Sequence, residues 1–273
     1  MKKWFSVTIS IVASIVILGA VVSGCGPKEV KWTMNSCENT HTQLGVIAWD
    51  EAVARISQQT DGKFQIRVVM NEEIGIAREQ FSEALAEGSI EMAQMQSAQL
   101  EAIMPHLVVF SLPYLTLTQE DCLKVASAIE YMTVPRMEEI GYRPITPDSI
   151  WCFSPQEILV KEPIEDWSDL GGIKIRVWRS GDAKLLEAVG AEPVYMAFSE
   201  VYMALQRGVI DGVNTSAEGM LTGSLYEGAK HFYGVHFPRS ICYDVVALKY
   251  WNDLPDEYKK ILQEESRVAA KKI

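Results

Sequence analysis

Hydrophobic and polar positions change period along the first third of the chain, and each period predicts a type of element. Apolar side chains at every second position are typical of half-buried strands, whereas apolar side chains three and four positions apart are typical of helices. These patterns predict strands at 30–35, 63–69 and 90–95 and helices at 44–59 and 77–87. The resulting strand–helix–strand–helix–strand order predicts a mostly parallel sheet with helical crossovers.

The rest of the chain continues this mixture of elements without an internal repeat or a low-complexity linker. The patterns predict helices at 119–140, 181–189, 198–207 and 255–272, and strands at 158–160, 173–178, 209–213 and 241–248. This order fits two α/β lobes between which the chain passes more than once. Ligands of open α/β sheets bind in a cleft at the strand ends. We expect lobe I to comprise 25–149, lobe II to comprise 150–240, and 241–273 to return to lobe I and supply a helix that connects the lobes.

Composition and charge narrow the class of ligand. The chain has 273 residues, of which 48% are hydrophobic and 22% are charged, and this balance is typical of a folded globular protein. Its formal net charge of −11 argues against nucleic acid, which requires a basic face. If the ligand is an anion, the positive charge that binds it must be local and partly buried.

The N-terminus carries an export signal. Two lysines precede an almost wholly apolar run over 5–22, and the sequence VSGC follows at 22–25. This arrangement predicts a lipoprotein signal peptide at 1–24, because the cysteine resembles the end of a bacterial lipobox, where cleavage leaves a lipidated Cys25 as the membrane anchor. An uncleaved transmembrane anchor is the alternative, since about 18 apolar residues can span a bilayer. Either interpretation places the body of the protein outside the cytoplasm.

Neither the cysteines nor the histidines form a motif of known chemistry. Besides Cys25, the chain has four cysteines, at Cys37, Cys122, Cys152 and Cys242. In an exported chain they permit three disulfide pairings, but they are equally compatible with buried thiols. Their spacing does not suggest zinc, and we expect no metal and no cofactor. The sequences GxSxG, GxGxxG and GxxxxGK[ST] are absent, and the histidines are dispersed. A binding protein is therefore a better hypothesis than an enzyme.

The strand predicted at 173–178 carries the main candidate for ligand binding. Residues i and i+2 share one face of a strand, so Arg176 and Trp178 project together with Lys174 beyond them. A guanidinium matches a carboxylate through two parallel charge-assisted hydrogen bonds, and an indole beside it excludes water. The alternatives are an ion pair between Arg176 and a glutamate of the other lobe, or a solvated sheet edge.

Two long segments resemble a known transporter family. VYMAFSEVYMALQRGVIDGV at 194–213 and DLGGIKIRV at 169–177 are similar to the substrate-binding proteins of tripartite ATP-independent periplasmic (TRAP) transporters. The segments KWTMN, FSLPYL and YWNDLPDEYKKIL match in the same order, so that the resemblance covers 30–273. It implies a two-lobed periplasmic-binding-protein-like fold that closes on a small organic acid and delivers it to a membrane permease without ATP hydrolysis.

The resemblance also assigns roles to individual residues. Arg176 falls on the arginine that pairs with the ligand carboxylate, and Phe198 falls on an aromatic residue that lines the pocket. Asn35 matches a polar residue at the end of the first strand, and Gln96 falls where a member that binds sialic acid has a glutamate. Without the resemblance, Phe198 could be core, Asn35 could cap the following helix, and Gln96 could be an exposed loop residue.

Departures from the family pattern suggest a less polar ligand. Thr215 stands where the family often has an asparagine, with Asn214 beside it, and Gln156 replaces a second arginine found in some members. Trp178 and the nearby Trp151 add apolar surface. We therefore expect a less polar monocarboxylate, although Trp151 could be core and the pair at 214–215 could be turn residues.

Together these observations predict a monomeric, lipid-anchored binding component of a TRAP transporter, in the periplasm or on the outer face of the membrane. A ligand-sensing partner of a membrane receptor and a hydrolase in the same cleft are the alternatives. Family members run some tens of residues beyond Ile273, so the sequence is expected to be a fragment or a shortened member.

Overall fold

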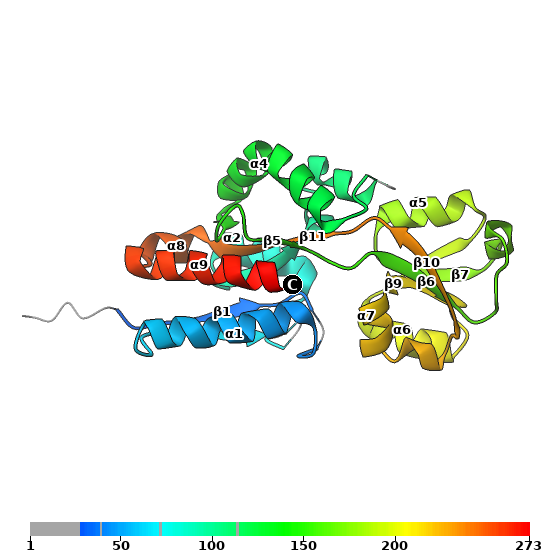
Figure 1. Cartoon of the computed structure of the whole chain (residues 1–273), viewed down its shortest axis with the longest axis horizontal. Helices are drawn as coiled ribbons and strands as arrows, with labels where there is room; N and C mark the ends of the chain where they lie inside the picture. The colour runs from blue at the N-terminus through cyan, green and yellow to red at the C-terminus, as the bar shows by residue number, and fades with distance from the viewer. Residues whose placement is uncertain (1–27, 39, 71–72, 113–114) are drawn as a thin grey trace, which may run out of the picture.

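The computed structural model describes residues 28–38, 40–70, 73–112 and 115–273, which form two α/β lobes side by side (Figure 1). The predicted signal peptide at 1–24 and Cys25 lie outside the described residues. Within the described part of the chain, no helix combines the length and the apolar character needed to cross a bilayer.

The first lobe is built on a mixed sheet with the strand order β2-β1-β3-β11-β4, in which β5 also pairs with β11. The strands β1 and β2, and likewise β1 and β3, are parallel as the sequence predicts, whereas β11 is antiparallel to β3, β4 and β5. The prediction of a mostly parallel sheet is therefore wrong, because β11 enters from the second lobe. The strands are β1 (Val30–Asn35), β2 (Phe64–Val69), β3 (Met92–Gln96), β4 (Tyr142–Pro144), β5 (Ile150–Cys152) and β11 (Ile241–Ala247).

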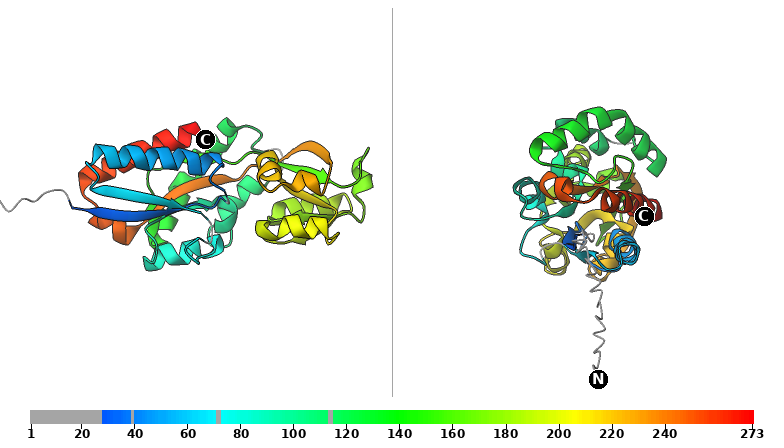
Figure 2. Two further views of the ribbon diagram at one scale, coloured as in Figure 1. Left: turned by 90° about the horizontal axis from the view of Figure 1, so that it is seen from below. Right: turned by 90° about the vertical axis from the view of Figure 1, so that its left-hand side faces the viewer.

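Helices cover both faces of this sheet. They are α1 (Leu44–Gln59), η1 (Arg78–Gln80), α2 (Phe81–Glu87), α3 (Ser97–Leu100), η2 (Pro105–Ser111), α4 (Gln119–Ile140), α8 (Leu248–Asp253) and α9 (Asp256–Lys272). The helices α1 and α9 lie side by side (Figure 2), and Tyr258 and Leu262 of α9 share a core with Trp49 and Ile56 of α1. The helix α9 thus packs against α1 and β5 of the first lobe.

The second lobe has a five-stranded sheet with the order β10-β6-β9-β7-β8. Its elements are β6 (Gln156–Val160), η3 (Trp167–Leu170), β7 (Lys174–Val177), α5 (Ser180–Ala188), β8 (Glu192–Tyr195), α6 (Phe198–Gln206), β9 (Gly212–Ser216), α7 (Ala217–Thr222), η4 (Leu225–Glu227) and β10 (His231–Phe237). One face packs Ile175 and Val177 against α5, and the other packs Val213 against α6.

The strand predicted at 209–213 begins three residues later, at Gly212. Gly208 has a φ of 72°, and the Val209 N–H donates to the carbonyl of Ala204, so the apolar pair Val209-Ile210 belongs to the end of α6. Hydrophobic residues just beyond such a left-handed helix end commonly pack back on the last turn, and Ile210 is buried there.

Two crossings join the lobes, from β5 to β6 and from β10 to β11. The boundary predicted at 149/150 falls before β5, but β5 pairs with β11 in the first sheet, so the second lobe begins at β6. The lobes also touch where α5 meets η2. There a Cβ on Gly181 would lie 2.9 Å from the carbonyl oxygen of Ser111, so a glycine is needed for this close approach.

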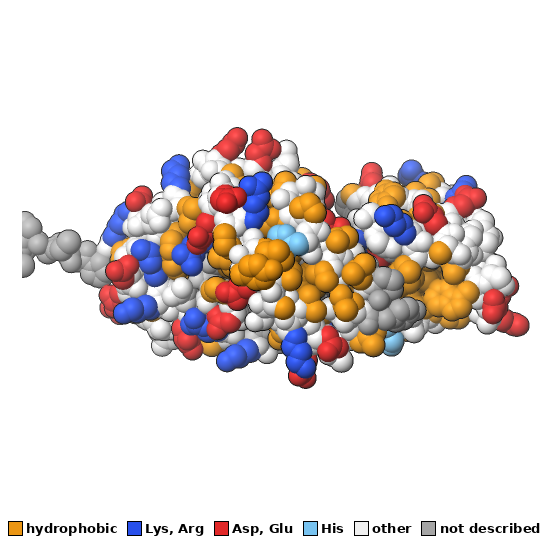
Figure 3. All heavy atoms as spheres, turned by 90° about the horizontal axis from the view of Figure 1, so that it is seen from above, with side chains coloured by type: hydrophobic (Ala, Val, Ile, Leu, Met, Phe, Trp, Pro, Cys, Tyr) orange, Lys and Arg blue, Asp and Glu red, His pale blue; other side chains and the backbone are white. Residues whose placement is uncertain are grey.

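Surface charges of both signs alternate over the face shown in Figure 3, which also shows the narrow waist between the lobes. The net charge of −11 is therefore not gathered in one patch on this face.

Candidate functional site: the cavity between the lobes

A cavity of about 540 Å³ lies between the lobes and is lined by residues of both. This volume lies in the range of small-molecule sites. The first lobe contributes mainly polar side chains, among them Glu38, Gln43, Arg78, Glu79, Gln96 and Gln99. The second lobe contributes a cation, aromatic side chains and hydroxyls, among them Arg176, Trp178, Phe198, Ser199, Thr215 and Ser216.

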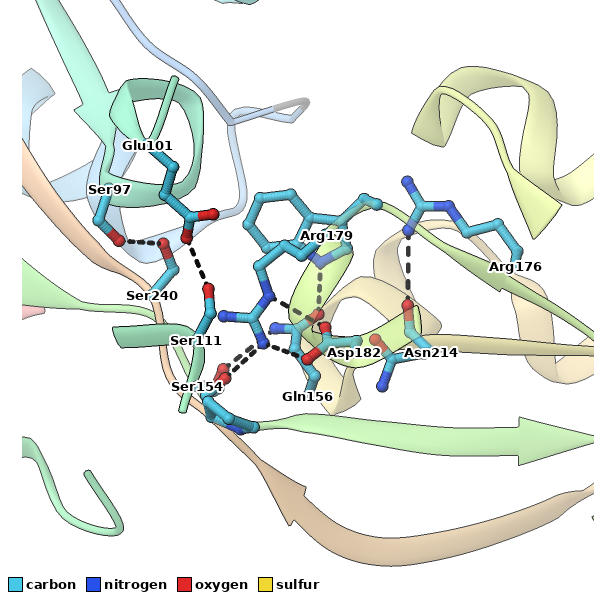
Figure 4. Close-up of polar contacts among 12 residues, drawn as sticks. Ser97, Glu101, Ser111, Ser154, Gln156, Arg176, Arg179, Asp182, Asn214 and Ser240 are labelled. Carbon is cyan, nitrogen blue, oxygen red and sulfur yellow. Dashed lines mark hydrogen bonds and ion pairs between the residues drawn. The ribbon is translucent and has the colours of Figure 1, made fainter. Parts of the chain in front are cut away.

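Arg176 is the buried cation of this cavity. Strand alternation turns Ile175 and Val177 into the core and leaves Arg176 on the cavity side, 4% exposed. Its Nε donates to the carbonyl of Met196 at 3.2 Å. Its Nη1 donates to the carbonyl of Asn214 at 3.5 Å (Figure 4). These two backbone bonds fix the guanidinium plane.

No ion pair among the described residues includes Arg176. Burial, and then repulsion from Arg78 across the cavity, lower the pKa of Arg176 to about 10. The Phe198 ring lies 5.7 Å from the guanidinium carbon and stabilises the charge through its π face. Arg176 is thus a desolvated cation at the cavity wall, without a paired carboxylate in the part of the chain that the structure describes.

Arg179, three residues further along, forms a buried structural ion pair within the second lobe. Its Nη2 lies 2.8 Å from Oδ1 of Asp182, and both side chains are almost completely buried. The same nitrogen donates to the carbonyl of Pro238 at 2.7 Å (Figure 4). Two neighbouring arginines therefore differ in kind: Arg179 is neutralised inside the second lobe, and Arg176 is not.

Trp178 forms part of the cavity wall and is fixed by a residue singled out from the sequence. Its Nε1 donates to Oε1 of Gln156 at 3.1 Å, and Gln156 itself lines the cavity. Gln156, which stands where some members of the family have a second arginine, therefore positions the indole of Trp178.

Glu38 is a buried acid on the opposite wall. It is 3% exposed, and its carboxylate accepts from the N–H of Val46 at 2.7 Å at the start of α1. Burial, together with the charges of Glu218 and Asp244, raises the pKa of Glu38 to about 7, although the bonds from the α1 backbone oppose this shift. Glu38 therefore changes charge near neutral pH, beside the cavity.

The structure brings five of the eight candidate ligand-binding residues to the cavity wall. These are Arg176, Phe198, Gln96, Thr215 and Trp178. Sequence reasoning did not identify Glu38, Arg78 and Gln99, because their positions depend on how the lobes face each other. The polar SCENTHTQ turn before α1 was a signal for Glu38, since a carboxylate near a helix start can bind its free N–H groups.

The other three candidates do not line the cavity. The side-chain amide of Asn35 donates to the carbonyl of Met92 at 2.9 Å and joins β1 to β3. Trp151 is core, 1% exposed, and its Nε1 donates to Asp244 at 3.3 Å. Asn214 is fully buried and reaches the site only through its carbonyl, which accepts from Arg176.

The fold and the cavity define a two-lobed protein of the solute-binding class. The region 37–273 matches the family described as bacterial extracellular solute-binding protein, family 7 (DctP). This chain belongs to that family. Members of the family are binding proteins and not enzymes. Their extracellular location agrees with the predicted position of this protein outside the cytoplasm.

Two relatives illustrate the similarity in sequence. The C4-dicarboxylate-binding periplasmic protein DctP of Rhodobacter capsulatus is 31% identical over 87% of this chain and 70% of its own length. The uncharacterized protein YiiZ of Salmonella typhimurium is 29% identical over 67% of this chain and 56% of its own length. The chain thus spans less than two thirds of YiiZ.

Solved structures show the same fold. DctP7 of Bordetella pertussis, an extracytoplasmic solute receptor that binds pyroglutamic acid, superimposes with a TM-score of 0.80 at 20% identity, over 88% of this chain and 78% of that one. A TRAP periplasmic solute-binding protein of Haemophilus influenzae with bound L-gulonate gives a TM-score of 0.78 at 24% identity, over 89% and 79% of the two chains.

Proposed function

We propose that this protein binds a small organic acid between its lobes and delivers it to the membrane permease of a TRAP transporter. The observation that carries the proposal is Arg176, a buried cation at the cavity wall with no carboxylate partner among the described residues. An unpaired buried charge is costly, and a ligand carboxylate would supply the missing opposite charge. Family membership and the solute-binding structural relatives support the same conclusion.

The cavity favours a polar acid. Its wall carries Gln96, Gln99 and Glu38 in addition to hydroxyl groups, so it offers partners for ligand hydroxyls and amides. The expectation of a less polar acid depended partly on Trp151, which lies in the core. The ligands of the relatives, namely a C4-dicarboxylate, pyroglutamic acid and L-gulonate, are all polar acids of a size that suits the cavity.

Within this proposal, Arg176 binds the carboxylate, Phe198 and Trp178 exclude water around it, and Gln96 and Thr215 bind the polar remainder of the acid. Asn214 acts indirectly, because its carbonyl holds the guanidinium. Because both lobes line the cavity, the ligand contacts both at once in the closed arrangement and shifts the population towards it. The permease then recognises the closed form.

We further propose that the mature protein is a monomer held at the membrane by a lipid on Cys25. The VSGC sequence after the apolar run supports this anchor. Mass spectrometry of the mature N-terminus should find Cys25 as the first residue with a diacylglyceryl group. Release of a Cys25→Ala variant from the membrane fraction is expected, and retention of that variant would contradict lipid anchoring.

Calorimetric titration with matched ligands tests the proposed function. The panel includes gulonate, galactonate, glucuronate, pyroglutamate and C4-dicarboxylates, each paired with its neutral amide or parent sugar. At least one acid should bind tightly, and its neutral counterpart should bind at least about 100-fold more weakly, since it forms no charge-assisted bonds with Arg176. Equal binding of an acid and its amide, or binding of neutral compounds alone, would refute the proposal.

A further inference from the structure

The four cysteines between residues 37 and 242 are all buried, and the structure shows them as free thiols. The thiols of Cys37 and Cys242 are hydrogen-bonded to each other, and so are those of Cys122 and Cys152. Each pair joins residues far apart in the sequence. The contacts therefore arise from the tertiary fold and not from local turns.

Sheet geometry separates the two pairs. Cys152 of β5 lies opposite Ile241, and Cys242 of β11 lies opposite Trp151, so the two cysteines are one residue out of step on neighbouring strands. Because successive side chains of a strand point to opposite faces, Cys152 and Cys242 project from opposite sides of the sheet.

The two cores confirm this separation. Cys152 and Cys122 belong to one hydrophobic cluster, and Cys242 and Cys37 belong to another that also contains Trp151. Of the three possible pairings of four cysteines, only the one that joins Cys37 to Cys242 and Cys122 to Cys152 avoids crossing the sheet.

Both pairs lie where the chain passes between the lobes. Cys152 ends β5, the last strand before the first crossing, and Cys242 stands near the start of β11, just after the second. Their partners belong to the body of the first lobe, since Cys37 follows β1 and Cys122 lies in the first turn of α4. A covalent bond within each pair would tether one crossing strand to that body.

We propose that these cysteines form two disulfides, Cys37–Cys242 and Cys122–Cys152, which a thiol–disulfide oxidoreductase outside the cytoplasm introduces during folding. In each step two S–H bonds and the S–S bond of the oxidoreductase break. One S–S bond forms in this chain, and two electrons and two protons convert the oxidoreductase to its dithiol. The proposal requires the extracytoplasmic location and does not depend on the identity of the ligand.

Burial explains why the bonds form before the fold is complete. Burial raises the pKa of the Cys242 thiol. In the other pair, the hydrogen bond between the two thiols raises the pKa of Cys152 and lowers that of Cys122. A thiol that stays protonated and inaccessible reacts slowly, because the thiolate is the reacting species. A chain that folds in its reduced state is therefore expected to resist later oxidation.

The first disulfide also affects the ligand cavity. Cys37 is part of the cavity wall, and the side-chain amide of Gln96 donates to its sulfur at 3.5 Å. A bond to Cys242 fixes this sulfur, and with it the turn that carries Glu38 on the same wall.

Peptide mapping tests the pairing directly. The full chain, exported and processed by a bacterial host, is unfolded in N-ethylmaleimide without reductant, digested and analysed by mass spectrometry. We expect linked peptides for Cys37–Cys242 and Cys122–Cys152, with no maleimide on these four residues. Recovery of either pair in alkylated form overturns the proposal for that pair, and any other linkage overturns the geometric argument.

Thermal unfolding of the wild-type protein provides a second test. Protein that is unfolded and refolded in the presence of a reductant should have a Tm lower by about 5 to 10 °C for each disulfide opened. The matched control is the double variant Cys122→Ala/Cys152→Ala, in which the reductant should produce only the part of this shift that belongs to Cys37–Cys242. A Tm that is insensitive to reductant in the wild-type protein would refute both disulfides.

Discussion

Replacing Arg176 by methionine tests the central claim about the cavity, because it removes the charge while keeping a long unbranched side chain. A guanidinium has five N–H donors. Two of them bind the carbonyls of Met196 and Asn214, which leaves three for a ligand. Two charge-assisted bonds to a carboxylate contribute roughly 1.5 to 3 kcal/mol each. We therefore expect Arg176→Met to lose about 3 to 6 kcal/mol of binding free energy, or about 100-fold to 10⁴-fold in Kd.

The same substitution should not destabilise the ligand-free protein. Burial lowers the pKa of Arg176 from 12.5 to about 10, which corresponds to a cost of roughly 3 kcal/mol for the charged form at about 1.4 kcal/mol per pH unit. Methionine removes this cost but leaves the carbonyls of Met196 and Asn214 without a donor, at about 1 kcal/mol each. The free energy of unfolding should therefore stay the same or rise by about 1 kcal/mol.

Arg179→Met is the matched control. Arg179 neutralises Asp182 in the interior of the second lobe, so its removal leaves a buried carboxylate unpaired. Breaking such a pair costs about 3 to 5 kcal/mol. Differential scanning fluorimetry should show a clear fall in Tm for Arg179→Met and none for Arg176→Met.

Titration with the best acid of the panel completes the experiment. Arg176→Met should abolish both the heat of binding and the increase in Tm caused by the acid, and Arg176→Lys should recover part of the affinity through its charge alone. A variant that lacks Arg176 and still binds the acid with wild-type affinity would refute the assignment. A fall in Tm as large as that of Arg179→Met would instead show that Arg176 is structural.

Substitutions at three further positions test other parts of the protein. Phe198→Ala should weaken binding of the acid about 10-fold in calorimetry, because the ring beside the guanidinium is lost, whereas Phe198→Tyr should bind like the wild type; equal weakening by both would contradict the role of the ring. Burial raises the pKa of Asp244 to about 7, so the folded protein retains a proton that the unfolded chain releases, and the free energy of unfolding should fall as pH rises from about 4 to 7. Asp244→Asn should roughly halve this slope in denaturant unfolding, since Glu38 also titrates near 7, and an unchanged slope would refute the assignment. Gly181→Ala places a methyl group 2.9 Å from the carbonyl oxygen of Ser111, at the contact between the lobes. It should weaken binding of the acid about 10-fold with little change in Tm. An unchanged affinity would show that this contact opens freely.

The sequence predicted much of the local structure because the apolar periods of most helices and strands are regular. The helices α1 and α4 begin and end at the predicted residues, and Arg176 was correctly placed on the opposite face of its strand from Ile175 and Val177. These predictions depend on neighbours within a few residues, for which period and turn chemistry are sufficient.

Features that depend on distant segments could not be predicted in this way. Trp151 was a candidate for the cavity because a sequence does not show that β5 is covered on both faces. Arg78 and Glu38 reach the cavity only when the second lobe faces the first, and nothing within their own segments indicates that arrangement. The antiparallel pairing of β11 was missed for the same reason, since its partners lie about ninety or more positions earlier in the chain.

The paired crossings have a mechanical consequence. On the first lobe β5 and β11 are hydrogen-bonded neighbours, and on the second lobe β6 and β10 are as well, so the two crossings run side by side as one ribbon. A ribbon of two strands resists stretching and sliding but bends across its flat face, which favours rotation of the lobes about one axis. A membrane partner that contacts both lobes would then detect the bound ligand through the angle between the lobes.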